Sequence, residues 1–292
     1  MKTDNEELVW FNGTIMPLSQ ARMGLEDRGF NFADGVYEVV RVYGGNTFTL
    51  QDHLERLQRS AAAIQLTIPL SIEQLAAEMR KLIARSGIQE AMVYLQLTRG
   101  ESPRSHAFTA GAKPTLFFYV RPVHAAWEPG MGQGCSVISV TDERWQRCYI
   151  KSIALLPNVL AKNHALNNGH DEAVFIHEGK VTECSSSNIF CVSGGRLISC
   201  AVGPKVLPGI TRLVLTRIAK RLGIIFDETA ITLEEALASD EVFITSTTRE
   251  LGWVRLWDGV TIGSGKCGAL TRKLHEAYRE EVLAETGETA AA

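Results

Sequence analysis

The chain has 292 residues, and at about 150 residues per domain this length predicts two domains. Hydrophobic residues make up 45% and charged residues 22% of it, which excludes a disordered chain, a collagen-like chain and a coiled coil. Lysines and arginines number 30 against 33 acidic residues, a net charge of -3 without a polybasic tract. We therefore expect a soluble folded protein with no nucleic-acid partner and no anionic membrane partner.

The N-terminus lacks the cationic start and apolar stretch of a signal peptide, and no run approaches the ~18 apolar residues of a membrane helix. We therefore expect a cytoplasmic protein. The cysteines all lie from residue 135 onward, contain no CxxC pair and mostly fall in strand-like runs. We expect buried thiols, with no disulfide and no metal site, at Cys135, Cys148, Cys184, Cys191, Cys200 and Cys267.

The first part of the chain alternates strand and helix patterns. One helix is predicted from a capping-box variant at Thr49 to Asp52, and another from Ser71, with Gln74 at the capping position, to Gly87. The first of these has a single apolar stripe, formed by Leu54, Leu57, Ala61 and Ile64. Strands are predicted at 8–11, 36–42, 92–97 and 115–120.

Prolines and glycines dominate residues 121–134, which predicts an interdomain linker. We therefore expect a smaller N-terminal α+β domain over 1–121, a linker over 122–134 and a larger domain over 135–292. In the larger domain, strands are predicted at 136–140, 189–192, 196–200 and 241–245, with hairpins at 178–180 and 257–259. Helices are predicted at 158–166, from 211 to 223, after 232 and at the C-terminus.

In the loop 98–106, Arg104 and His106 lie two positions apart after a proline. In an extended segment such side chains point the same way, about 6 to 7 Å apart, and both can grip one carboxylate. The alternative is a solvated cationic loop.

A second candidate site is the helix start at Leu207, Pro208, Gly209, Ile210 and Thr211. Free backbone N–H groups at a helix start, beside a hydroxyl, form an anion site suited to a phosphate. The hydroxyl-rich turns at 185–188 and 245–248 can join it, although each alone is only a turn signal. No P-loop and no GxGxxG after a strand occurs, which disfavours ordinary nucleotide binding.

Lys151 lies in a largely apolar stretch. A lysine in apolar surroundings has a lowered pKa, and its neutral amine can attack an aldehyde to form a Schiff base. The alternative is a lysine that extends to water from a strand end. On sequence alone, Glu183 reads as a solvent-facing strand residue, and Arg56 lies beside the apolar stripe of its helix.

Taken together, these segments resemble the class IV, or fold-type IV, pyridoxal-phosphate (PLP) aminotransferases, and within them the bacterial D-amino-acid aminotransferases. The resemblance runs nearly from end to end, from about residue 9 to the C-terminal helix. The segments that match are 26–39, 53–57, 98–106, 150–152, 156–162, 182–188 and 209–212. The resemblance implies a mixed α/β fold of two domains, with the cofactor at the cleft and bound mainly by the larger domain.

The resemblance also implies a role for each matching position. Lys151 would be the Schiff-base lysine and would shuttle the proton between the substrate Cα and C4′ of PLP. Glu183 would pair with the pyridine nitrogen and keep it protonated. The other cofactor contacts, to the phosphate and to the ring face, would come from Arg56, Leu207, Ile210, Thr211, Ser246 and Thr247.

For the substrate, the resemblance implies that Tyr37, Arg104 and His106 bind the carboxylate. It also implies a homodimer in which the loop that carries Arg104 and His106 reaches into the site of the other subunit. Branched-chain L-aminotransferases and aminodeoxychorismate lyases do not share this loop, which favours D-substrates. Three positions depart from the family pattern and affect the predicted preference for the substrate side chain: Phe30, Cys184 and Arg249. Of these, Arg249 is expected near the rim of the pocket.

The expected reaction is ping-pong transamination between a D-amino acid, such as D-alanine or D-glutamate, and a 2-oxo acid. The alternatives on the same fold are a branched-chain L-amino-acid aminotransferase, an R-amine aminotransferase and an aminodeoxychorismate lyase. A non-catalytic protein that binds a phosphorylated ligand at Gly209 to Thr211 is the alternative from another class.

Overall fold

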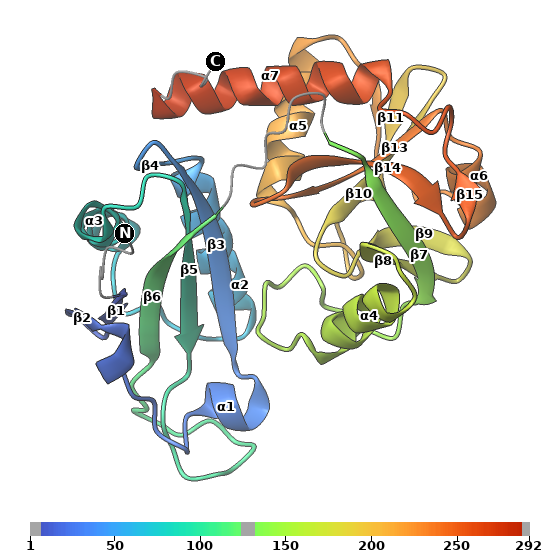
Figure 1. Ribbon diagram of the computed structural model, residues 1–292. Helices are drawn as coiled ribbons and strands as arrows, with labels where there is room; N and C mark the ends of the chain where they lie inside the picture. The colour runs from blue at the N-terminus through green and yellow to red at the C-terminus, as the bar shows by residue number, and fades with distance from the viewer. Residues whose placement is uncertain (1–6, 124–131, 288–292) are drawn as a thin grey trace. The chain divides into compact units, whose positions relative to one another are not determined.

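The computed structural model describes residues 7–123 and 132–287. The chain divides into two compact units (Figure 1). The first unit comprises the described residues of Met1–His124, Ile150–Ala154 and Val282–Ala292, and the second those of Ala125–Tyr149 and Leu155–Glu281. Among the described residues, no helix has the length and apolar character needed to cross a bilayer.

In the described part of the first unit, six strands form one antiparallel sheet in the order β2-β1-β6-β5-β3-β4. They are β1 (Leu8–Phe11), β2 (Thr14–Pro17), β3 (Gly35–Tyr43), β4 (Asn46–Thr47), β5 (Ala91–Thr98) and β6 (Thr115–Pro122). The predicted strands are confirmed. The sequence pattern did not predict β2, the 3-10 turn η1 (Leu18–Gln20) or the one-turn helix α1 (Arg28–Phe32).

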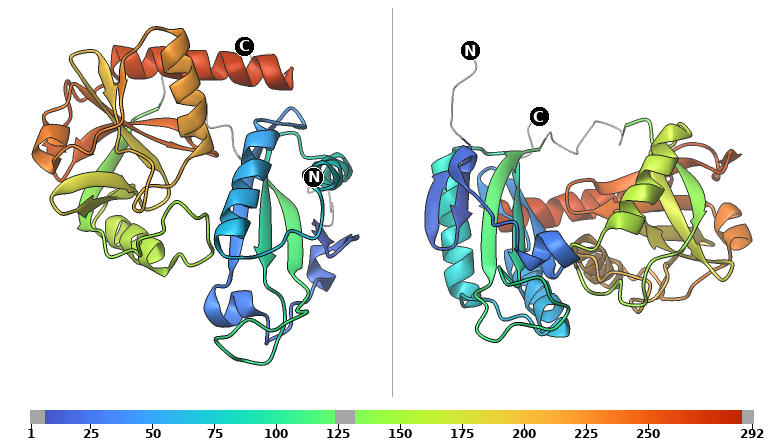
Figure 2. Two further views of the ribbon diagram at one scale, coloured as in Figure 1. Left: turned by 180° about the vertical axis from the view of Figure 1, so that it is seen from behind. Right: turned by 90° about the horizontal axis from the view of Figure 1, so that it is seen from below.

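Two helices, α2 (Leu50–Ala63) and α3 (Ile72–Ser86), pack on one face of this sheet (Figure 2). The predicted stripe of α2 forms part of the core, with Leu54 and Leu57 fully buried. The capping box of α3 at Ser71 is confirmed. The predicted capping box at Thr49 is wrong, because Thr49 adopts a left-handed φ of 52° and its hydroxyl donates to Phe48 O at 2.8 Å.

The other face of the first sheet carries a layer of stacked aromatic rings. Side chains alternate between the two faces of a strand, so Tyr37 points away from the core that Val36 and Glu38 enter. The ring of Tyr37 lies 5.8 Å from that of Tyr94, which stacks in turn on Tyr119 at 5.2 Å. Burial raises the pKa of Tyr94 well above its ordinary value.

Residues 150–154 belong to the first unit, although both flanking segments belong to the second. Tyr37 N donates to Lys151 O at 3.0 Å, and Ile153 N donates to Gly35 O at 3.1 Å. The side chain of Ile150 is buried in the core of the first unit. These contacts extend the edge of β3 by one short antiparallel bridge, from Val36 to Ser152.

In the described part of the second unit, nine strands form a mixed sheet in the order β12-β11-β10-β13-β14-β7-β8-β9, with β15 paired to β14. They are β7 (Cys135–Thr141), β8 (Glu172–His177), β9 (Lys180–Cys184), β10 (Asn188–Ser193), β11 (Arg196–Ile198), β12 (Phe226–Asp227), β13 (Glu241–Ser246), β14 (Glu250–Trp257) and β15 (Val260–Thr261). Three pairs are parallel: β14 with β7, β7 with β8, and β11 with β12.

Helices α4 (Leu156–Asn167), α5 (Ile210–Arg221) and α6 (Leu233–Leu237) pack against strands of this sheet. The C-terminal helix α7 (Ala269–Thr286) begins in the second unit and ends in the first. The helices predicted here are confirmed, and Thr232 and Glu235 form the capping box of α6.

The predicted linker 122–134 falls mostly outside the described residues, and the division at 121 and 135 stays a prediction. All six cysteines are free. Four are buried as expected, whereas Cys200 and Cys267 are half-buried.

Candidate active site

The amine of Lys151 lies on the aromatic face of the first sheet. Its Nζ is 4.1 Å from the centroid of the Tyr37 ring, a distance at which an ammonium interacts favourably with a ring face. The backbone of Lys151 is fixed on both sides, because its N–H donates to Ser60 Oγ at 3.1 Å and its carbonyl accepts from Tyr37. The first unit therefore holds a half-buried amine next to a phenol.

On the opposite face of β3, Glu38 is fully buried and fixes Arg56. Arg56 donates through Nε at 2.7 Å and through Nη2 at 2.8 Å, and His53 Nδ1 lies 2.8 Å from the same carboxylate. Burial alone raises the pKa of Glu38, but Arg56 and His53 outweigh it and lower this pKa well below its ordinary range. Burial lowers the pKa of His53, which keeps its ring neutral at neutral pH.

Arg104 and His106 do not lie in an extended strand. The chain bends at both positions, and the His106 carbonyl accepts a bond from Arg28. Both side chains nevertheless meet one ring: Arg104 Cζ is 5.1 Å and the His106 ring 5.6 Å from the centroid of Phe32. Both residues are exposed, so the loop presents a guanidinium and an imidazole to its surroundings.

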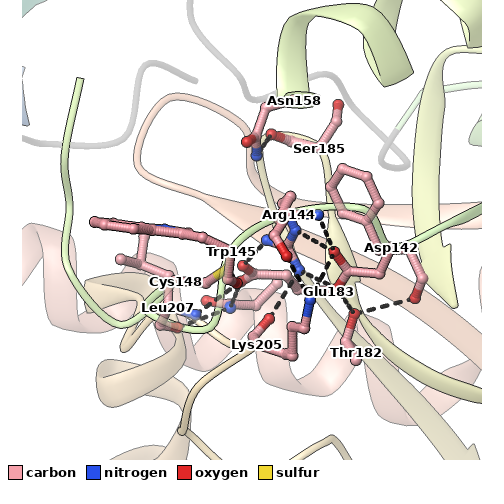
Figure 3. A network of polar contacts seen from close by, with 12 residues as sticks. Asp142, Arg144, Trp145, Cys148, Asn158, Thr182, Glu183, Ser185, Lys205 and Leu207 are labelled. Atoms are coloured by element: carbon pink, nitrogen blue, oxygen red, sulfur yellow. Dashed lines mark hydrogen bonds and ion pairs between the residues drawn. The ribbon is translucent and has the colours of Figure 1, made fainter. Parts of the chain in front are cut away.

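The second unit buries Glu183, contrary to its solvent-facing interpretation from sequence alone. Its carboxylate accepts from Arg144 Nη1 at 2.5 Å, from Asn188 Nδ2 at 3.0 Å and from Leu207 N at 3.0 Å. Figure 3 shows this network around Glu183, with Lys205 close to Arg144. Lys205 Nζ donates to Arg144 O at 2.6 Å. The carboxylate is thereby held in one orientation.

Arg144 is shared between two acids. It also donates to Asp142 through Nε at 3.0 Å and through Nη2 at 2.8 Å. Burial raises the pKa of Glu183, and the single bond from Arg144 does not offset it. By contrast, the bonds from Arg144 lower the pKa of Asp142 despite its burial. Glu183 is therefore the carboxylate of this network that gains most from a further positive partner.

Helix α5 begins next to Glu183. Its N-cap is Gly209, which provides no side-chain cap for the first N–H groups of the helix, those of Ile210 and Thr211. A Cβ at Gly209 would lie 2.0 Å from Asn188 Oδ1, so glycine is required for this close approach. Free N–H groups at a helix start attract anions, and Leu207 links this helix start to Glu183.

The hydroxyl-rich turns divide into two groups. Ser185 and Ser186 donate to the buried carboxylate of Glu172, so they serve the fold. In the other turn Ser246 Oγ accepts from Arg249 N at 3.2 Å, and Thr247 is half-buried. Arg249 Nη1 lies 3.1 Å from Cys135 Sγ; its predicted place at a pocket rim stays a prediction.

The comparison with protein families gives one match over most of the chain. The model of the family described as amino-transferase class IV matches residues 35–257. The chain belongs to this family.

Curated relatives of this class IV aminotransferase match it over almost its entire length. It is 40% identical to the D-alanine aminotransferase of Bacillus licheniformis, over 96% of this chain and 99% of the relative. It is 44% identical to the D-alanine aminotransferase of Listeria monocytogenes serotype 4b (strain F2365), over 96% and 98%. Among solved structures, the T.th. branched-chain amino acid aminotransferase with pyridoxamine 5'-phosphate is 26% identical, with a TM-score of 0.88 over 97% of this chain and 95% of that chain. The mixed α/β fold predicted for this family is confirmed.

The residues that orient the candidate groups were not predicted from the sequence. Glu38 was detectable, because it shares a strand face with Val36 and Val40, and a glutamate among inward apolar positions predicts a buried, paired acid. Asp142 and Arg144 gave no such signal, since they lie in an irregular segment after β7 and their partner Glu183 is 39 positions from Arg144.

Proposed function

We propose that this class IV aminotransferase is a PLP-dependent transaminase that exchanges the amino group of a D-amino acid, such as D-alanine or D-glutamate, with a 2-oxo acid. The observation that carries the proposal is the amine of Lys151, fixed through its backbone and held 4.1 Å from the ring of Tyr37. The D-substrate is supported by end-to-end similarity to curated D-alanine aminotransferases.

The available donors and acceptors fit PLP. Lys151 offers an amine for the aldehyde carbon, and Glu183 offers a buried carboxylate for the pyridine nitrogen. Arg56 and the N–H groups of Ile210 and Thr211 suit the phosphate. The remaining proposed contacts come from three half-buried residues, Leu207, Ser246 and Thr247. Leu207 would pack against the cofactor ring, and the hydroxyls of Ser246 and Thr247 would face the phosphate.

When bound, PLP supplies an electron sink that stabilises the negative charge developed at the substrate Cα. The residues of this chain do the rest. Glu183 keeps the ring nitrogen protonated, since a cation beside its buried carboxylate relieves the cost of burying that charge. Lys151 Nζ would take the proton from the substrate Cα and deliver it to C4′ of the cofactor, acting first as base and then as acid. The same residues serve both halves of a ping-pong cycle.

The substrate carboxylate is assigned to Tyr37, Arg104 and His106. A guanidinium and an imidazole near one point provide a charge-assisted set of donors for a carboxylate. Because Arg104 and His106 both contact the ring of Phe32, their side chains lie close enough to bind the same carboxylate. Side-chain preference beyond this carboxylate depends on groups such as Arg249.

The competing assignments are other activities on this fold. A branched-chain L-amino-acid aminotransferase is favoured by the solved structure described above. An R-amine aminotransferase or an aminodeoxychorismate lyase would not need a carboxylate trap at Arg104.

We also propose a homodimer in the cytoplasm. Support for the dimer comes from α4, where Leu156, Val159 and Leu160 are 68%, 50% and 62% exposed. Apolar side chains at this helical spacing suit a protein interface. The exposed Arg104 and His106 would then serve the site of the other subunit.

The test is the visible spectrum of the holoenzyme, recorded with D-alanine and separately with L-leucine. We expect D-alanine alone to bleach the yellow band, and borohydride reduction of the untreated holoenzyme to fix the cofactor to Lys151. Bleaching by L-leucine alone would contradict the D-assignment. A protein that stays colourless after cofactor is added would support the non-catalytic alternative.

The dimer is tested by co-expressing Lys151→Ala and Arg104→Ala chains with different tags. If the loop crosses between subunits, the mixed dimer regains one intact site and exceeds both parent variants in activity. Activity no higher than in the parents, in a mixed dimer confirmed by mass, would contradict the crossing.

A further inference from the structure

We propose that Arg28 is a positioning residue for substrate binding: it holds the backbone of residues 105–107 and thereby fixes Arg104 and His106 for the substrate carboxylate. This inference rests on the proposed function, which assigns the carboxylate to these two side chains. It concerns a residue that contacts neither cofactor nor substrate in the proposed roles.

One guanidinium holds three successive carbonyls of the loop. Arg28 Nη1 donates to Ser105 O at 2.5 Å and to Ala107 O at 3.4 Å, and Nη2 donates to His106 O at 3.4 Å. The segment has no helix or strand of its own. Exposed segments without such bonds sample many conformations, so these contacts restrict where Arg104 and His106 can point.

Arg28 is itself rigidly held. Its side chain is buried, and Nε donates to Asp34 Oδ2 at 2.8 Å. It is the first residue of α1, whose N-cap Asp27 accepts from Gly29 N at 2.8 Å and from Thr98 Oγ1 at 2.9 Å. A Cβ at Gly29 would lie 2.3 Å from Thr98 Cγ2, so α1 packs directly on the end of β5.

The charge of Arg28 is not fully neutralised by its partner. Asp34 is shared with Arg99, which donates to it through Nε at 2.8 Å and Nη2 at 3.0 Å. Two guanidinium groups therefore face one carboxylate, and their bonds lower the pKa of Asp34 despite its burial. The remaining positive charge of Arg28 favours bonds to carbonyl oxygens.

The aromatic contacts place Arg28 and the loop on the same ring. Phe32 lies one turn along α1 from Arg28, with its centroid 4.8 Å from Arg28 Cζ. Arg104 and His106 contact this ring from the loop side. In an extended strand, alternate side chains point the same way. The loop is bent, but Arg28 holds its backbone and Phe32 contacts both side chains, so Arg104 and His106 can still bind one carboxylate.

The experiment compares Arg28→Lys with Arg22→Lys. The lysine at position 28 keeps a positive charge but loses the planar fork that reaches several carbonyls. Arg22 is an exposed arginine of the same region that donates to Ser19 O and Ala21 O, so it controls for arginine loss. Each holoenzyme is mixed with D-alanine or with D-alaninamide, and bleaching of the yellow band gives an apparent Kd and a limiting rate.

We expect Arg28→Lys to weaken the apparent Kd for D-alanine by about tenfold, as for loss of a charge-assisted contact. The limiting rate and the Kd for D-alaninamide, which lacks the carboxylate, stay within about twofold, a difference worth less than 1 kcal/mol. An equal loss for both ligands would overturn the proposal, because it would mean a general structural role.

Loop order gives a second readout that needs no activity. In cofactor-free protein, trypsin cleavage after Arg104 is expected to be several times faster in Arg28→Lys than in Arg22→Lys, since local opening exposes the peptide bond. An unchanged cleavage rate would overturn the proposal. If Arg28→Lys does not fold, Phe32→Leu tests the same arrangement and must show the same selective loss for D-alanine.

The variant Arg104→Ala separates this inference from the proposed function. If Arg104→Ala leaves the Kd for D-alanine unchanged, the carboxylate assignment itself is wrong. If Arg104→Ala weakens binding and Arg28→Lys does not, only the positioning role of Arg28 is wrong. If both the carboxylate assignment and the positioning role are right, Arg28→Lys weakens D-alanine binding less in the Arg104→Ala background than in the wild type. The reason is that Arg28 acts through Arg104.

Discussion

Glu38 in the first unit and Glu183 in the second are both buried beside an arginine, yet the pKa values of these two glutamates shift in opposite directions. Glu38 has two nitrogens of Arg56 and a histidine, and its pKa is lowered. Glu183 accepts a bond from one nitrogen of Arg144, whereas two other nitrogens of Arg144 donate to Asp142. The pKa of Glu183 is raised.

The difference lies in whether the arginine is shared. An arginine that serves one acid compensates the cost of burying it, whereas a divided arginine leaves part of that cost uncompensated. In the first unit, Arg56 and His53 together compensate the buried charge of Glu38. In the second unit the acid retains a preference for one more positive partner, which is what a cofactor-binding carboxylate requires.

The largest expected effect on stability comes from Glu38→Gln. This change removes the carboxylate that accepts two bonds from the buried Arg56, and breaking one side of a buried ion pair costs about 3 to 5 kcal/mol. Urea unfolding of the cofactor-free protein measures this loss. Glu55→Gln is the control, because Glu55 pairs with Arg59 on the exposed surface of α2 and should cost less than about 1 kcal/mol. Equal losses in the two variants would contradict the pairing argument.

A smaller loss of stability and a larger loss of turnover are expected from Glu183→Gln. Arg144 keeps Asp142 as its partner, so the cost is about 1 to 3 kcal/mol for the unmatched donors around the new amide. With a neutral side chain at the ring nitrogen, kcat should fall by roughly 100-fold. Steady-state kinetics at saturating cofactor measures it, with Glu178→Gln in the exposed turn before β9 as control. A kcat close to that of the control would argue against the cofactor role.

The smallest expected effect is a difference in pH dependence. The pKa of Glu38 is lowered in the folded state, so its stabilisation is complete above the unfolded value of about 4.3 and is lost as the pH falls below it. The pKa of Glu183 is raised, so acidification protonates the folded state first and increases stability until the pH reaches about 4.3.

Unfolding free energies of the cofactor-free wild type and both variants, measured between about pH 7 and pH 4, test these signs. From high to low pH, the advantage of the wild type over Glu183→Gln should grow. Its advantage over Glu38→Gln should stay constant and then shrink near the acid end. Parallel curves for the two variants would mean that the two acids do not differ.

Features coded by nearby residues were predictable from the sequence. The stripe of Leu54 and Leu57 and the capping box at Ser71 depend on spacings of three or four residues, and the structure has both. The prediction at Thr49 used the same rule and was wrong. Thr49 N donates to Glu285 Oε1 at 2.7 Å, a contact 236 positions away that favours a different backbone conformation.

The candidate site was predictable as a set of residue types but not as an arrangement. Lys151 and Glu183 stood out through the family resemblance, whereas Arg28 and Arg144 gain their importance from partners distant in the chain. Arg28 reaches Ser105 across 77 positions. Local periodicity carries no information about such contacts, so the supporting network is visible only in the folded structure.

The composition of the first unit has a consequence for synthesis of the protein. Its residues come from three separate stretches, and the last of them begins at Val282. Thr286 O accepts from Asn46 Nδ2 at 3.0 Å, and Glu285 accepts from Thr49 N. A chain emerging from the ribosome therefore has the strands of the first sheet early, but cannot complete the first unit until residues 282–286 have been added.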